Sequence, residues 1–201
     1  MYSPWQEGWE WRSLHSRESY MTTKQASAGF SLAEALVVLA LLAVLLGLAV
    51  PGVASLRQRH QLQSVAEDVW NSLVLARSQA LVQQTRVALC PAAAAGVCDP
   101  QGQWGQGWLV FVDNNSNGLR DADEPVLQSR GPLPSGVLVQ GNSTVRLGMG
   151  YGGDGRSESR NGGFQSGTYT VCKPGLLEQW KVVVNMLGRP RMEKVEAADC
   201  P

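Results

Sequence analysis

The longest apolar stretch of the chain runs from residue 30 to residue 50. Only Ser31 and Glu34 interrupt it, and Pro51 and Gly52 follow it. About 20 apolar residues are enough for a helix to cross a bilayer. No small-residue site of the kind that signal peptidases cut follows the stretch. The pattern therefore predicts a membrane-spanning helix that stays with the mature chain, with residues 1–29 as a leader before it.

A second helical pattern continues from the span to about residue 84. Its apolar residues recur at intervals of three and four, which places them on one stripe of a helix. They are Leu62, Val65, Ala66, Val69, Leu73, Ala76 and Ala80. We expect one long helix, with a transmembrane half at 30–52 and an amphipathic half at 53–84 that packs on a head. Pro51 and Gly52 should kink it or loosen a turn.

From residue 85 onward, short apolar runs alternate with Gly, Pro and Asn, a pattern typical of an antiparallel sheet. The predicted strands are residues 86–90, 108–112, 126–129, 137–140, 144–147, 168–172 and 181–186. A helix followed by such strands indicates the fold class α+β, with residues 85–201 as a β-rich head. The Gly- and Ser-rich stretch at 152–163 predicts a surface loop.

Charge is balanced over the chain but not along it. Lysine plus arginine and aspartate plus glutamate each number 17, so the net charge implies no partner. Residues 98–124, however, hold five acids and one base, whereas residues 130–191 hold eight bases and three acids. Such an asymmetry can steer a polyanion even at zero net charge.

The four cysteines, Cys90, Cys98, Cys172 and Cys200, all follow the predicted span. An even number suits disulfides in an oxidising compartment. Zinc is the rival interpretation, but no pair has the C-x2-C spacing of a zinc site. Four cysteines allow three pairings. Our hypothesis joins Cys90 to Cys98 and Cys172 to Cys200.

The acidic stretch matches the spacing of an EF-hand calcium loop. The matching residues are Asp113, Asn115, Asn117, Gly118, Asp121 and Glu124, at positions 1, 3, 5, 6, 9 and 12. The context differs, because predicted strands flank the stretch where an EF-hand has helices. We favour a β-hairpin whose turn takes its positive φ angles from Asn117 and Gly118. A calcium site at 113–124 is the alternative, and no other cofactor is expected.

Residues 29–34, Gly-Phe-Ser-Leu-Ala-Glu before an apolar run, resemble the type III signal of type IV pilins and pseudopilins. The resemblance implies that a prepilin peptidase cuts between Gly29 and Phe30 and methylates the new N-terminus at Phe30. It also implies that Glu34 pairs with the N-terminal amine of a neighbouring subunit in a filament. An unpaired carboxylate in an apolar setting is costly, which fits such a pairing. The alternative is an ordinary signal anchor that tolerates Glu34.

The leader is longer than pilin leaders usually are. Residues 21–29 alone fit the short, basic form, so we expect translation to start at Met21. In either case the cut after Gly29 removes the leader.

Residues 75–80 running into 87–91, and residues 104–113 with Asn117, Gly118 and Glu124, resemble the pseudopilin H family. This family includes the type II secretion pseudopilin H and the FimT-type minor pilins. The resemblance implies a long N-terminal helix laid against antiparallel sheet, and a single-pass inner-membrane protein with its head in the periplasm. It implies other pilin or pseudopilin subunits as partners. No hydrolase motif or paired apolar carboxylates are present, so we expect no enzyme.

A short basic element, Gly188-Arg189-Pro190-Arg191, follows the strand predicted at 181–186. Glycine allows close approach of a ligand, proline stiffens a turn, and two guanidinium groups can each bind a phosphate through forked hydrogen bonds. In FimT-type minor pilins a G-R-x-R element near the C-terminus is associated with DNA binding for uptake. The resemblance implies that role for Gly188, Arg189 and Arg191.

Lys181 and Lys194 are the expected helpers of this basic element. The alternative is a solvated turn whose arginines pair with Glu193 or Glu196. Two functions therefore stay open at the level of sequence. One is a minor pilin that binds DNA, and the other is a structural pseudopilin of a type II secretion system with protein partners only.

Overall fold

The computed structural model describes residues 29–94, 96–196, 199 and 200, with backbone alone for residues 48–54. The predicted leader, apart from Gly29, and the predicted start at Met21 lie outside the described residues. The chain divides into two compact units, Met1–Leu46 and Gly47–Pro201. We describe each by itself.

Helix α1 (Leu32–Gln83) is the predicted long helix. Its helical backbone continues through Pro51 and Gly52, so the turn that we expected to loosen there stays helical. Among the described residues, no helix is long and apolar enough to cross a membrane. The span predicted at 30–50 ends on residues whose side chains lie outside the description.

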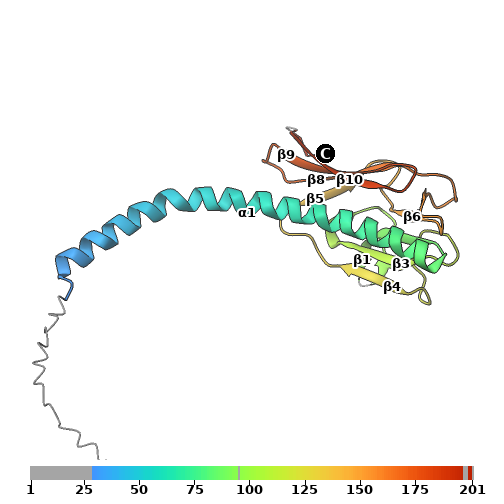
Figure 1. Cartoon of the computed structure of the whole chain (residues 1–201), viewed down its shortest axis with the longest axis horizontal. Coiled ribbons are helices and arrows are strands. Elements are labelled where there is room, and N and C mark those ends of the chain that lie inside the picture. Colours follow the sequence, from blue (N-terminus) through green and yellow to red (C-terminus); the bar gives the residue numbers. More distant parts are fainter. Residues whose placement is uncertain (1–28, 95, 197–198, 201) are drawn as a thin grey trace, which may run out of the picture. The chain divides into compact units, whose positions relative to one another are not determined.

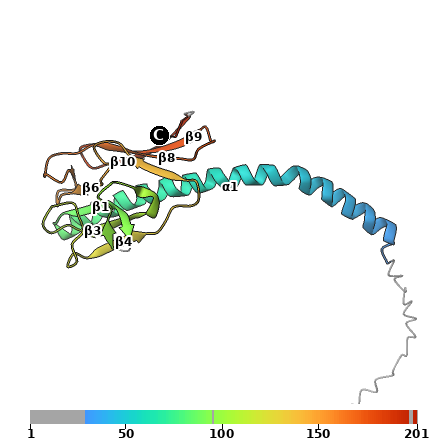
Figure 2. The same ribbon diagram turned by 180° about the vertical axis from the view of Figure 1, so that it is seen from behind.

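In the unit Gly47–Pro201, α1 runs between two antiparallel sheets (Figures 1 and 2). The first sheet has the order β4 (Val126–Arg130), β3 (Trp108–Val112), β1 (Val87–Ala94), β6 (Met149–Tyr151) and β7 (Ser157–Glu158), and β2 (Val97–Cys98) pairs with β1. The second has the order β10 (Pro190–Glu196), β9 (Glu178–Val184), β8 (Gly167–Cys172) and β5 (Leu138–Gly141). A short 3-10 helix, η1 (Trp104–Gln106), precedes β3. The α+β prediction is confirmed.

One hydrophobic core joins the helix to both sheets. All seven residues of the predicted stripe on α1 are almost fully buried. They pack with inward-facing residues of the first sheet, such as Val87 and Leu89, and of the second, such as Val171 and Val182. Trp104 belongs to this core, with its ring centre 5.1 Å from that of Tyr169. The stripe is therefore the surface that fixes both sheets in place.

The two disulfides join Cys90 to Cys98 and Cys172 to Cys200, with Cα atoms 5.6 Å apart in each. This is the pairing that the sequence analysis favoured. The first bond closes the β1–β2 hairpin over a second apolar cluster, on the outer face of the first sheet. The second attaches the C-terminal segment to the end of β8.

Two predictions about the strands are wrong. Residues 144–147 form turns, in which the N–H of Val145 donates to the carbonyl of Asn142 and its side chain is fully buried. The stretch at 152–163, predicted as a surface loop, contains β7 and the fully buried Ser157. Strands β2, β6, β7 and β10 were not predicted, because three of them have only two or three residues and the fourth carries alternating charges.

Candidate functional site

The predicted processing site lies directly before α1. Gly29 and Phe30 are exposed, and the Oγ of Ser31 accepts the N–H of Glu34 at 3.2 Å. Serine and glutamate three residues apart are the residues of a helix capping box, a role that the sequence analysis did not recognise. Among the residues that the structure describes, the exposed Glu34 carboxylate makes no ion pair. Its negative charge is therefore available to a cationic group.

The acidic loop, residues 113–125 between β3 and β4, begins with a buried charge cluster. The fully buried Asp113 carboxylate accepts hydrogen bonds from Nε of Arg86 at 2.8 Å and from the N–H of Gly118 at 3.0 Å. The Nη1 of Arg86 binds Glu158 at 2.8 Å, from β7. Burial lowers the pKa of Arg160 below its ordinary value, and nearby Asp113 opposes the shift. Arg86 thus supplies the positive charge that balances the buried Asp113.

The carboxylates of Glu124 and Asp121 are also hydrogen-bonded, whereas the buried Oδ1 of Asp113 has no hydrogen-bond partner among the described residues. Glu124 accepts the N–H groups of Asn114 at 2.8 Å and Asp121 at 2.9 Å. The Asp121 carboxylate accepts the side-chain amides of Asn115 at 2.6 Å and Asn117 at 3.1 Å. Within the described part of the chain, no group of His, Cys, Asp and Glu could hold a metal ion.

The hairpin interpretation of this loop is right in its strands and wrong in its turn. Strands β3 and β4 pair antiparallel on either side of it. The positive φ angles belong to Ser116, at 61°, and Gly118, at 69°, and not to Asn117. A loop of this length is shaped by its side-chain hydrogen bonds, so the two-residue turn rule did not apply.

The basic turn, residues 185–189, joins β9 to β10. The side-chain Oδ1 of Asn185 accepts hydrogen bonds from the N–H groups of Leu187 at 3.1 Å and Arg189 at 3.0 Å. The backbone carbonyl of Asn185 accepts one from the N–H of Gly188 at 2.9 Å. Gly188 has φ 73°, and a Cβ there would collide with the carbonyl oxygen of Gly155. Gly188 is therefore required for packing at this point, and its role in the approach of a ligand stays a prediction.

Pro190 and Arg191 belong to strand β10 and not to the turn. Pro190 is the first residue of this edge strand, where its missing N–H costs no ladder hydrogen bond, and its Cα pairs with that of Val184. The Nε1 of Trp70 on α1 donates to its carbonyl at 3.3 Å. Contrary to the prediction, Pro190 thus does not stiffen a turn. It begins a strand that is hydrogen-bonded to α1.

The two arginines of this element are both exposed. Arg191 pairs with Glu193 at 3.8 Å, and 71% and 42% of their side-chain surfaces are exposed, so the pair is weak. Within the described residues, Arg189 makes no ion pair and neither arginine pairs with Glu196. Two guanidinium groups are therefore presented to solvent, of which Arg191 alone has a loosely held acid, Glu193, beside it.

The two predicted helpers lie in less open surroundings. Lys194 forms an ion pair with Glu178 at 2.8 Å, and Glu178 also lies 3.9 Å from the Nε of Arg59. Lys181 is directly opposite Glu193 in the β9–β10 ladder. Each lysine thus has an acid beside it, as Arg191 does, whereas Arg189 makes no ion pair within the described residues.

Residues 152–157 pack against the basic turn and support it. The Nε of Arg77 on α1 donates to the carbonyl of Gly155 at 2.9 Å, and the Oγ of Ser157 lies 2.9 Å from the carbonyl oxygen of Asn185. The buried ring of Tyr151 lies beneath Gly188. Burial raises the pKa of Tyr151 above its ordinary value, and nearby Arg77 opposes the shift. The turn thus rests on well-packed structure.

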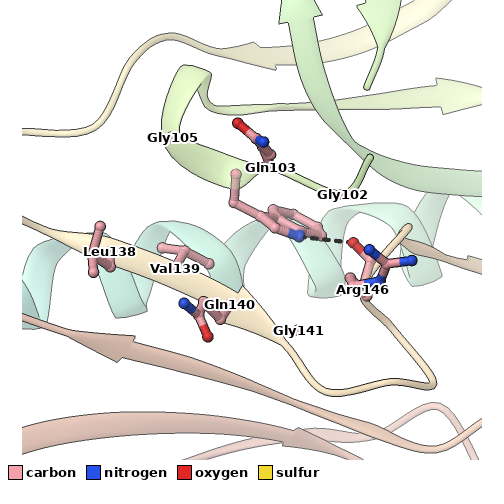
Figure 3. A pocket seen from close by; sticks show the side chains of 9 residues that line it. Gly102, Gln103, Gly105, Leu138, Val139, Gln140, Gly141 and Arg146 are labelled. Carbon is pink, nitrogen blue, oxygen red and sulfur yellow. Dashed lines mark hydrogen bonds between the residues drawn. The ribbon is translucent and has the colours of Figure 1, made fainter. Parts of the chain in front are cut away.

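A groove of about 490 Å³ lies between η1 and β5 (Figure 3). Its lining includes Gly102, Gln103 and Arg146, and the Nε1 of Trp104 donates to the carbonyl of Arg146 at 3.0 Å. Arg146 is the one charged side chain among the lining residues. The groove thus offers no pair of titratable groups for acid–base chemistry.

Comparison with known proteins gives two family matches and one structural likeness. A family described as type II transport protein GspH matches residues 65–188, and the prokaryotic N-terminal methylation motif matches residues 24–50. Two crystal forms of the type IV minor pilin FimU of Pseudomonas aeruginosa share the fold, at 19% and 17% identity and TM-scores of 0.54 and 0.51. They cover 71% and 68% of this chain, and 98% and 99% of the FimU chains are covered. No curated protein matches.

Proposed function

This chain belongs to the family of the type II transport protein GspH, and we propose that its exposed Arg189 and Arg191 bind the phosphates of DNA. The chain is a pilin-like subunit of a type IV pilus-like system, because the GspH match, the methylation motif and the fold agree. Members of these families are structural filament subunits and not enzymes. The DNA contact would make this subunit a minor pilin of the FimT type.

The observation that carries the DNA proposal is the exposure of the two guanidinium groups. Arg189 is free of ion pairs within the described residues, and Arg191 has only the weak pair with Glu193. Neither group must lose a strong partner before it binds a phosphate. A guanidinium presents a fork of donors that fits a phosphate, which an ammonium group does not.

The test is a titration of labelled duplex DNA with the full-length chain in neutral detergent at low salt. We expect Arg189→Gln with Arg191→Gln to weaken binding to all sequences alike, because phosphate contacts carry no sequence information. Arg57→Gln is the matched control, since Arg57 is exposed on α1 about 20 Å along the helix from Trp70, which contacts Pro190. Equal affinity of the double variant and the wild type would overturn the proposal.

We further propose that Gly29 and Phe30 form the processing site and that the mature N-terminus anchors the chain in the inner membrane, with the head in the periplasm. The methylation motif over residues 24–50 supports this assignment. Mass spectrometry of the mature protein should find an N-terminus at Phe30 with one added methyl group. An intact leader would contradict it, and Gly29→Val should leave the precursor uncut.

Glu34 is the residue that we propose for filament assembly. Its carboxylate is exposed in the first turn of α1, where a neighbouring N-terminal amine would balance its charge. Glu34→Val should mature normally and incorporate poorly into filaments, as measured by the amount of the subunit in sheared filament fractions. Incorporation at the wild-type level would show that the pairing is not needed.

The second candidate function is that of a structural pseudopilin in type II secretion. The description of the matching family favours it. In that case the partners are proteins alone, and the exposed arginines have no nucleic-acid role. A deletion strain that loses protein secretion while DNA uptake continues would decide for this candidate.

A further inference from the structure

Exposed apolar and cationic side chains gather where two turns of the head meet. We call this the two-turn surface and define it by Arg156 and Phe164 from one segment and by Met186, Leu187 and Arg189 from the basic turn. The three apolar side chains are 64%, 59% and 55% exposed, respectively. Exposed apolar residues that stand together, unlike scattered ones, mark a site of interaction.

The two segments are held together by their backbones. The Oγ of Ser157 lies within hydrogen-bond distance of the carbonyl oxygens of both Gln165 and Asn185, the neighbours of Phe164 and Met186. The N–H of Gln165 in turn donates to the carbonyl of Ser157 at 3.0 Å. Phe164 and the basic turn are therefore fixed beside each other before any ligand binds, which limits the entropy lost on binding.

Phe164 carries a stacked guanidinium group. The Cζ of Arg156 lies 5.4 Å from the centre of the Phe164 ring, and the ring still has most of its surface exposed. The ion pair of Arg156, with Asp154 at 3.5 Å, has both side chains about half exposed and is weak. Aromatic rings and guanidinium planes are the groups on which unpaired bases stack.

We propose that the two-turn surface binds single-stranded DNA in preference to duplex DNA. A base stacks on Phe164 and Arg156 while Arg189 binds a phosphate of the same strand. The bases of a duplex are already stacked on each other, so they cannot use Phe164, whereas their phosphates can still reach Arg189. The inference rests on the proposed DNA contact and identifies the form of DNA that the site prefers.

The experiment compares labelled oligothymidine with a duplex of the same length, titrated with the full-length chain in neutral detergent at low salt. Phe164→Leu keeps an apolar side chain and removes the ring. It should weaken single-strand binding by about 5- to 150-fold, the value of one base–aromatic stack. It should change duplex binding by less than about twofold, since the phosphate contacts are unaltered. Arg189→Gln should weaken both.

Leu177→Ala is the matched control. Leu177 is 69% exposed before the start of β9, about 23 Å along that strand from the basic turn. It should leave both affinities unchanged. An unchanged unfolding midpoint of Phe164→Leu would show that the loss of binding is not a loss of fold.

Two results would overturn the single-strand inference alone. In the first, Phe164→Leu binds oligothymidine as well as the wild type does. In the second, the wild type binds the duplex more tightly than the single strand, while the double variant of Arg189 and Arg191 still weakens duplex binding. If the wild type binds neither DNA at low salt, the proposed DNA function itself is wrong.

Discussion

The acidic loop and the basic turn are the same kind of connection, each in its own sheet, but they use their charges in opposite ways. Each joins two neighbouring antiparallel strands, and in each the chain's own side chains satisfy the backbone. In the acidic loop, Asp113 is buried against Arg86, so its charge is used within the fold. In the basic turn and the start of β10, by contrast, Arg189 and Arg191 are left at the surface. A cluster of charges in a sequence is thus a candidate binding site only where folding leaves it exposed.

The difference follows from the cost of removing charges from water. A buried carboxylate needs a partner and further hydrogen bonds, which Asp113 obtains from Arg86 and Gly118. An exposed guanidinium group keeps its hydration and has no such need. Arg189 and Arg191 therefore contribute little to stability. What holds the basic turn is the hydrogen bonds of Asn185 and the packing of Gly188 against Gly155.

The largest expected effect comes from removing Arg86, the buried positive charge that balances Asp113 of the acidic loop. Arg86→Met would leave Asp113 buried without its counter-charge, and we expect the free energy of unfolding to fall by about 3–5 kcal/mol. Denaturant unfolding of the full-length chain in detergent measures it. Arg156→Gln is the control, because its surface pair with Asp154 is worth about 0–1 kcal/mol. Equal losses of unfolding free energy in the two variants would contradict the claim that the buried charge matters more for stability than the exposed one.

The packing beneath the basic turn is tested with a glycine pair. Gly188 and Gly162 have φ angles of 73° and 77°, but only a Cβ at Gly188 would collide with its surroundings. Gly162→Ala should cost about 1–2 kcal/mol through its backbone conformation. Gly188→Ala should cost about 1–3 kcal/mol more through overpacking, as measured by the same unfolding method. Equal costs would mean that the turn is not packed against Gly155.

Tyr151, below the basic turn, predicts how stability depends on alkaline pH. Its raised pKa means that the folded state keeps the proton while the unfolded state loses it near pH 10, so stability falls as pH rises above about 10. Each such tyrosine contributes a slope of up to about 1.4 kcal/mol per pH unit. Tyr151→Phe should give a shallower decline above pH 10 and the same stability at pH 7. An unchanged alkaline slope would contradict the burial of its hydroxyl.

The smallest effect is expected from calcium. The Oδ2 of Asp113 and the carboxylates of Asp121 and Glu124 already accept hydrogen bonds from the chain, so calcium would have to break several of these bonds. The buried Oδ1 of Asp113 has no hydrogen-bond partner among the described residues, but one oxygen is not a set of ligands. The thermal unfolding midpoint in calcium should differ from that in chelator by less than about 1 °C. A rise of several degrees would show that the ion displaces Arg86, and that the spacing of residues 113–124 was the better guide.

The sequence was a good guide wherever the information was local. The stripe from Leu62 to Ala80 follows from helical spacing alone, and the hypothesis that paired Cys90 with Cys98 joined cysteines only eight residues apart. It was a poor guide to contacts between distant segments. Arg86 meets Glu158 across 72 residues, and Gly188 meets Gly155 across a turn that matched no strand pattern. Strand β10 has no apolar alternation, because it is a charged edge strand.

The account depends most directly on the claim that Arg189 and Arg191 contact phosphates. The measurement is the salt dependence of duplex binding for the full-length chain and for its Arg189→Gln, Arg191→Gln variant. Each phosphate neutralised contributes about −0.9 to the slope of log affinity against log salt. We expect the slope of the variant to be shallower by roughly two units, with Arg57→Gln parallel to the wild type. Parallel lines for the double variant and the wild type would contradict the claim.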